Sequence, residues 1–207
     1  MAVRTPSHFE FVVKAHRSLT HEPPADLAPA IEAFKVALRP FIQAQKLAGV
    51  LLQFPYAFQP VPANRERLAR LAGDLAGQPV IVEFRHRAWF RDDFLDGVRK
   101  LGLSLCCVDE PALPGLPPPE AILTGPIGYV RFHGRNKEAW WSNEREGEGR
   151  DPHARYRYNY SVEEMKEWVP KVRGLAERAS RVFVFFNNHP EGFAANNALA
   201  FRALLAS

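Results

Sequence analysis

Six short apolar segments, each followed by polar or charged residues, constrain the fold of this 207-residue chain more than any other feature. Stretches with helical spacing lie between most of them, and alternation of strand and helix is typical of a parallel sheet. We therefore predict an α/β fold with about six parallel strands. The strand segments are residues 9–13, 49–52, 80–82, 103–108, 129–130 and 182–186.

The polar residues that follow these segments define a candidate site. Because parallel strands all point one way, their carboxyl ends meet at one rim, which is where ligands bind in open α/β sheets and in (β/α)8 barrels. We expect this rim to gather Lys14, His16, Gln53, Glu83, Arg85, Asp109, Arg131, His133 and Asn187.

Composition places the chain among cytoplasmic globular domains. Hydrophobic residues make up 46% of it, and the formal net charge of +4 permits an anionic ligand without requiring nucleic acid. No apolar run approaches the roughly 20 residues needed to span a membrane, and the N-terminus does not resemble a signal peptide. The two cysteines, Cys106 and Cys107, are adjacent on a strand, so we expect reduced thiols on opposite faces.

Local signals predict some helix boundaries and loops. Ser161 and Glu164 form a capping box sequence, and Asn196 or Asn197 is expected to cap the last helix. The polar segment 142–153 is predicted to be a loop, either a lid over the rim or a surface insertion.

Several short motifs, in this order along the chain, resemble the domain of unknown function 72 (YecE-like) family. They are FVVKAHRSLTH at 11–21, LQFP at 52–55, VEFRHRAW at 82–89, YVRFHG at 129–134, YRY at 156–158, FNN at 186–188 and GFA at 192–194. The resemblance implies a TIM-barrel-like (β/α) fold, with residues 1–207 forming a single partial domain. It transfers no settled activity.

The resemblance also implies that two strand–helix units are missing. Family members usually begin with a Gly-Thr-Ser-Gly-Trp-like strand, followed by a Glu-x-Asn-x-(Thr/Ser)-Phe-Tyr-like strand, and neither occurs here. The chain is thus expected to hold about six of the eight strands of a barrel. Exposed sheet edges would then favour oligomers or aggregates.

Pairs of residues two positions apart carry the candidate chemistry. Glu83 and Arg85 share a face, either as an ion pair that orders the rim or as a carboxylate tuned for proton transfer. Arg131 with His133, and Lys14 with His16, repeat the spacing, and together with Arg85 they predict a positive floor for a phosphate or carboxylate.

Two classes of function follow. The first is a hydrolase acting on a phosphoester, glycosidic or other anionic substrate, with Glu83, Asp109 and His133 as catalytic residues. The second is a module that binds nucleic acid or an anionic ligand without catalysis. In the first, substrate is bound by Lys14, His16, Gln53, Arg85, Arg131, Asn187 and Asn188.

The absence of some well-known motifs argues against several classes of enzyme. The chain has no dinucleotide fingerprint, Walker loop or Gly-x-Ser-x-Gly elbow, which argues against the common nucleotide-dependent oxidoreductases, P-loop enzymes and serine esterases. Glu83, Asp109, His133 and His16 have the ligand types of a divalent metal site but no recognisable ligand spacing, so a metal is left unassigned.

Overall fold

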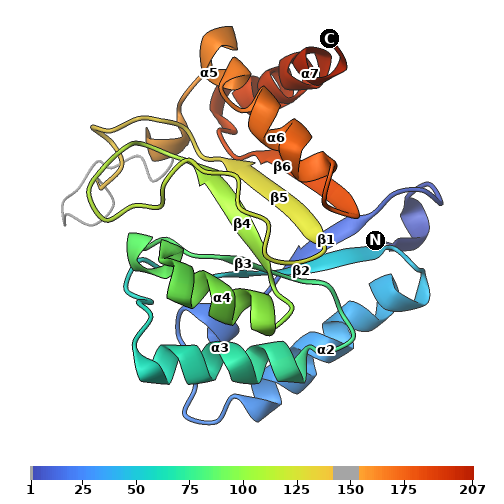
Figure 1. The fold of residues 1–207 in the computed structure, drawn as a ribbon. Helices are drawn as coiled ribbons and strands as arrows, with labels where there is room; N and C mark the ends of the chain where they lie inside the picture. Colours follow the sequence, from blue (N-terminus) through green and yellow to red (C-terminus); the bar gives the residue numbers. More distant parts are fainter. Residues whose placement is uncertain (1, 142–153) are drawn as a thin grey trace. The chain divides into compact units, whose positions relative to one another are not determined.

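The computed structural model describes residues 2–141 and 154–207, and in this part of the chain six parallel strands form one sheet (Figure 1). The strands are hydrogen-bonded in sequence order, which is the strand order of a (β/α) barrel and confirms the predicted α/β fold. Their bounds are β1 Phe11–Lys14, β2 Leu47–Gln53, β3 Val80–Glu83, β4 Ser104–Asp109, β5 Ile127–Phe132 and β6 Arg181–Phe186.

Seven α-helices accompany these strands in the described residues. They are α1 Arg17–Thr20, α2 Ala28–Gln43, α3 Pro62–Asp74, α4 Asp92–Lys100, α5 Val162–Lys166, α6 Val169–Ala176 and α7 Phe193–Ala206. Short 3-10 helices occur at Ala2–Arg4, Arg87–Phe90, Ala154–Tyr156 and Pro190–Gly192.

The chain divides into two compact units, each with its own core. Unit 1 comprises Met1–Leu105 with Thr124–Pro126, and unit 2 comprises Cys106–Leu123 with Ile127–Ser207. Unit 1 therefore holds β1 to β3 and the start of β4, whereas unit 2 holds the rest of β4 with β5 and β6.

In unit 1, helices α2, α3 and α4 lie along one side of β1 to β3 (Figure 1). An aromatic stack continues from the ends of β2 and β3. The ring of Phe84 lies 4.2 Å from that of Trp89 and nearly parallel to it, and Phe54 stacks on Phe58 at 3.9 Å. The Trp89 indole N–H donates to the Phe58 carbonyl at 2.6 Å, which fixes the orientation of the indole.

In unit 2, α5, α6 and α7 pack together beside β5 and β6 (Figure 1). Phe132 lies at the centre of this core, with its ring stacked on Phe186 and edge-on to Trp168. Cys107 packs into the same core. Cys106 and Cys107 are both buried and form no disulfide bond, and burial raises the pKa of the Cys107 thiol to about 11.

The helix signals were partly right. The capping box of Ser161 and Glu164 is present at the start of α5. The prediction that Asn196 or Asn197 caps the last helix is wrong, because α7 already begins at Phe193 after Gly192 turns the chain with φ of 75°. The predicted loop at residues 142–153 lies outside the described residues.

No helix within residues 2–141 or 154–207 has the length and hydropathy needed to cross a membrane.

Candidate functional site

Strand register places three of the expected site residues on one face of the sheet in unit 1. Gln53 at the end of β2 is aligned with Glu83 at the end of β3, and Lys14 at the end of β1 is aligned with Leu51. Aligned residues point the same way, and so do residues two apart on a strand. Lys14, Gln53 and Glu83 therefore project from the same side of three adjacent strand ends.

Glu83 is fully buried and paired with Arg85. The Arg85 Nε lies 2.8 Å from Glu83 Oε1, and the Arg85 side chain is 13% exposed while that of Glu83 is 0% exposed. Removing a carboxylate from water is costly unless an opposite charge compensates it. The ion pair, one of the two interpretations that the two-residue spacing left open, is thus present, and it holds the carboxylate in place at a strand end.

Three cations of unit 1 act on His21. The pKa of His21 is lowered by partial burial, then by the charges of Lys14 and Arg17 and more weakly by Arg85, while Glu22 raises it. These three cations therefore lie close enough to His21 to act on it. Arg17 and His21 were not expected as site residues, although both stand in the segment 11–21 beside Lys14.

His16 has a local role in the structure. Its Nδ1 accepts a hydrogen bond from the Ser18 backbone N–H at 3.3 Å and so caps α1. The side chain is exposed beside the cations of the β1 end.

Asp109, at the end of β4 in unit 2, is enclosed by donors. Its two oxygens accept from Arg135 Nε at 2.8 Å and Arg135 Nη2 at 2.6 Å. They also accept from the Tyr160 hydroxyl at 2.7 Å and the Trp168 Nε1 at 2.6 Å. An ionised carboxylate offers about four acceptor positions, which these four bonds match. Asp109 therefore connects the end of β4 to Arg135, Tyr160 and Trp168, which is a structural role.

Arg135 links Asp109 to the C-terminal end of α5. Its guanidinium also bonds Glu167, with Nη2 at 2.8 Å from Oε2, which lowers the pKa of that carboxyl. Burial and the neighbouring Asp109 raise the pKa of Tyr160 well above its usual value, so its hydroxyl stays protonated and donates. Arg135 was not expected as a site residue, although it continues the two-residue spacing of Arg131 and His133.

A second group in unit 2 joins the ends of β5 and β6. Asn187 Oδ1 accepts from Arg131 Nη2 at 2.9 Å, and its Nδ2 lies 3.5 Å from the His133 Nδ1. Three expected site residues are therefore brought together. Register aligns Arg131 with Phe185 but Asp109 with Phe132, so Arg131 and Asp109 point to opposite faces of the sheet.

Asn188 belongs to a buried amide network. The residue is 0% exposed, and its Nδ2 donates to the Tyr158 carbonyl and to Asn197 Oδ1, both at 2.7 Å. Asn197 in turn donates to Asn159 Oδ1 at 3.0 Å. These bonds fix the segment before α5 against the start of α7.

The described residues contain no group of three or more His, Cys, Asp or Glu side chains placed to hold a metal ion.

Comparison with known proteins covers the whole chain. A family model described as "Protein of unknown function DUF72" matches residues 1–207. The UPF0759 protein YunF of Bacillus subtilis is 34% identical over 212 residues, which cover 97% of this chain and 74% of that protein.

Solved structures agree with the sequence comparison. A DUF72 family protein from Thermotoga maritima gives a TM-score of 0.89 at 38% identity and matches 99% of this chain and 76% of its own. One from Enterococcus faecalis gives 0.86 at 28% identity and matches 100% of this chain and 82% of its own. The α/β fold with six parallel strands is therefore shared with known DUF72 structures.

Proposed function

The chain belongs to the DUF72 family, and we propose that it is a hydrolase of a phosphate-bearing or otherwise anionic substrate, with Glu83 as the proton-transfer group. One observation carries the proposal. Glu83 is buried at a strand end and paired with Arg85, and Arg85 is one of the cations that lower the pKa of His21. A buried carboxylate near cations that can bind an anionic group has the parts that hydrolysis requires.

The proposed roles follow from position. A neighbouring guanidinium favours the ionised form of a carboxylate, so Arg85 would keep Glu83 ready to accept a proton from an attacking water. Lys14 projects from the same side of the sheet and would hold the anionic group of the substrate. Gln53, aligned with Glu83, would hydrogen-bond the substrate or the water.

In unit 2 we distinguish residues proposed to contact the substrate from residues that stabilise the site. Arg131, His133 and Asn187, joined at the ends of β5 and β6, remain proposed substrate-contacting residues. We assign Asp109 and Asn188 to support, because the Asp109 oxygens accept from Arg135 and the Asn188 Nδ2 donates to Asn197.

A paired-variant screen tests the proposal. Purified protein is assayed with phosphomonoesters, phosphodiesters, glycosides and damaged DNA, with and without divalent metals. We expect turnover that falls by roughly 10²- to 10⁴-fold in Glu83→Gln, the usual loss on removing a general acid or base. Glu66→Gln changes an exposed carboxylate on α3 and serves as the control. Equal turnover in the two variants would remove Glu83 from the chemistry.

A second candidate function, binding of nucleic acid or an anionic ligand without catalysis, is favoured by the exposure of the cations at the β1 end. Lys14 is exposed, and the Arg17 side chain is 64% exposed although it pairs with Glu22 at 2.5 Å. Phosphate contacts by such groups weaken steeply with salt. Salt-dependent binding that is lost in Lys14→Gln but retained in Glu83→Gln, without turnover, would favour this function over hydrolysis.

A further inference from the structure

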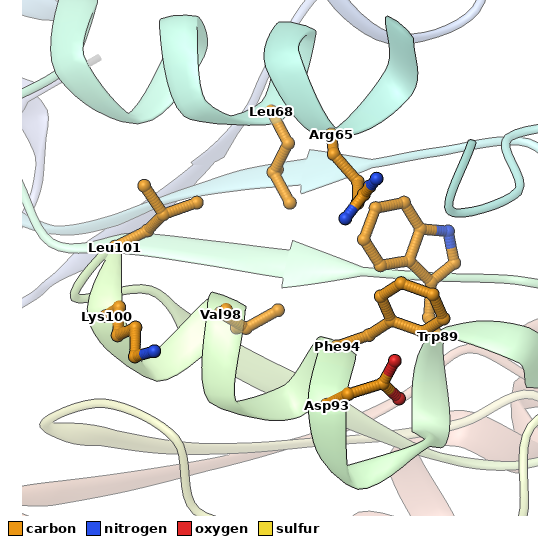
Figure 2. Close-up of a pocket in the computed structure, with 9 residues that line it drawn as sticks. Arg65, Leu68, Trp89, Asp93, Phe94, Val98, Lys100 and Leu101 are labelled. Atoms are coloured by element: carbon orange, nitrogen blue, oxygen red, sulfur yellow. The ribbon is translucent and has the colours of Figure 1, made fainter. Parts of the chain in front are cut away.

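Unit 1 contains a pocket that shares no residue with the proposed hydrolytic site. It lies between α3 and α4 and has a volume of about 250 Å³ (Figure 2). Arg65 and Leu68 reach into it from α3, and Phe94 and Val98 reach into it from α4. The remaining lining residues are Trp89, Asp93, Gly97, Lys100 and Leu101.

The walls of this pocket are apolar and held in place. Leu68, Trp89 and Val98 are at most 2% exposed, so they belong to the core as well as to the pocket. The hydrogen bond from Trp89 to Phe58 fixes the indole, and the Phe94 ring lies edge-on to it at 6.0 Å. A pre-formed apolar cavity with a few polar groups at its rim is the usual form of a small-molecule site.

The charges at its rim favour an anion. Asp93 is paired with Arg91, whose Nε lies 3.1 Å from Oδ1. Arg65 and Lys100 form no ion pair among the described residues, and the Arg65 guanidinium lies 5.8 Å from the centroid of the Phe94 ring. With Asp93 compensated, Arg65 remains as the cation beside the aromatic wall, because Lys100 lies at the other end of the pocket and points away from it (Figure 2).

Gly97 keeps the pocket open. This glycine lies inside α4, where glycine costs about 1 kcal/mol of helix stability relative to alanine. A Cβ at this position would meet no atom within 4 Å, so packing does not require glycine here. A larger side chain would instead project into the space that Gly97 lines.

We propose that the pocket between α3 and α4 binds a small aromatic carboxylate, with its ring against Trp89 and Phe94 and its carboxylate on Arg65. The volume is just below the roughly 300–1,000 Å³ typical of drug-sized ligands, which suits a single-ring or fused-ring acid. The aromatic walls favour a planar ring over an aliphatic chain, and the Arg65 guanidinium favours an acid over its amide.

Fluorine NMR of para-fluorophenylacetate tests the proposal, with para-fluorophenylacetamide as the neutral control. We expect saturable binding of the acid by the full chain, and binding of the amide that is weaker by about three- to tenfold. Arg65→Gln should weaken binding of the acid by a similar factor and leave binding of the amide unchanged. No saturable binding of the acid, or equal binding of acid and amide, overturns the proposal.

Filling the pocket gives an independent test. Gly97→Leu should abolish binding of para-fluorophenylacetate while the protein unfolds no more easily than the parent. Gly174→Leu is the matched control, because Gly174 lies inside α6 and its Cβ would also meet no atom within 4 Å. Full binding by folded Gly97→Leu, or an equal loss in Gly174→Leu, would show that the acid binds elsewhere.

Discussion

Two buried carboxylates at the ends of neighbouring strands, Glu83 in unit 1 and Asp109 in unit 2, have opposite kinds of partners. Both are 0% exposed, and both pair with an arginine. Glu83 pairs with Arg85, two residues further along the same loop. Asp109 accepts from side chains 26, 51 and 59 residues away in the sequence.

This difference in partners distinguishes a carboxylate that stabilises the fold from one that is proposed to react. The bonds of Asp109 tie the end of β4 to the loop after β5 and to the segments around α5, so its loss must disturb several elements together. The pair of Glu83 and Arg85 connects neighbouring residues, so its loss should disturb the fold less. We therefore assign Asp109 a role in stabilising the fold and propose that Glu83 takes part in the chemistry.

Asp109→Asn should give the largest loss of stability. It would turn an amide N–H₂ toward donors and remove the buried carboxylate that Arg135 bonds through Nε and Nη2, which costs about 3–5 kcal/mol for a buried pair. Equilibrium unfolding in denaturant measures the change. Asp96→Asn is the control, because it breaks an exposed pair with Arg99 that is worth less than about 1 kcal/mol.

If Asp109→Asn yields no folded protein, Trp168→Phe gives a milder test of the same cluster. It removes one donor to Asp109, at a cost of about 1–3 kcal/mol. A loss for either variant no larger than that of Asp96→Asn would contradict the structural role of Asp109.

Gly134→Ala should be the next most harmful substitution. Gly134 has φ of 93°, and its Cβ would lie 2.8 Å from the Tyr158 Cβ. A left-handed conformation outside glycine costs about 1–3 kcal/mol, before any displacement of Tyr158. Gly174→Ala, at an unhindered helical position, should instead stabilise by about 0.5–1 kcal/mol. Thermal unfolding of both variants checks the contrast, which equal melting temperatures would refute.

Glu83→Gln should cost less stability than Asp109→Asn, about 1–3 kcal/mol, because the uncompensated Arg85 retains some access to water. Denaturant unfolding under the same conditions gives the comparison. A loss as large as that of Asp109→Asn would mean that both carboxylates are primarily structural.

Self-association should respond to the exposed aromatic surface of β6. In the described sheet β6 has β5 as its one neighbour, and Phe185 is 40% exposed. Strand edges beside apolar side chains promote association. We expect the chain to form oligomers by light scattering and Phe185→Lys to reduce them. Leu199→Lys, which changes a residue 55% exposed on α7, should not. Equal masses for the two variants would exclude β6 as the contact.

The strands could be predicted from sequence because their signals are local. Each apolar run with a polar end, such as Val80–Glu83, appears as a strand within a few residues of its expected bounds. The face on which Asp109 lies could not be predicted. All six residues of β4 are buried, as is usual in parallel sheets, so no alternation of polar and apolar residues reveals which side faces the helices.

The partners of the site residues depended on long-range packing. Arg135 meets Asp109 across 26 residues, and no local pattern specifies such a contact. In unit 1 the signals were short-range, and the two-residue spacing of Glu83 and Arg85 already offered their ion pair as one of two interpretations. Asn197 was misplaced as a helix cap because its amide bonds are made to the segment at 159–160 and to Asn188.

The central claim, that the strand ends of unit 1 bind an anion beside Glu83, is tested most directly by the pKa of His21. In the free protein the pKa of His21 is lowered from its ordinary value, first by burial and then by the charges of Lys14 and Arg17. A folded-state pKa below the unfolded value also means that its contribution to stability is present above pH 6.5 and is lost as the pH falls through the folded pKa.

A bound anion would offset the neighbouring positive charge and favour the imidazolium. Histidine NMR titrations with increasing inorganic phosphate should therefore show a saturable rise in the pKa of His21. The rise should be smaller in Arg85→Gln than in the parent protein, and the control Arg99→Gln should show the same rise as the parent. A His21 pKa that does not respond to phosphate, or responds equally in both variants, would contradict the account.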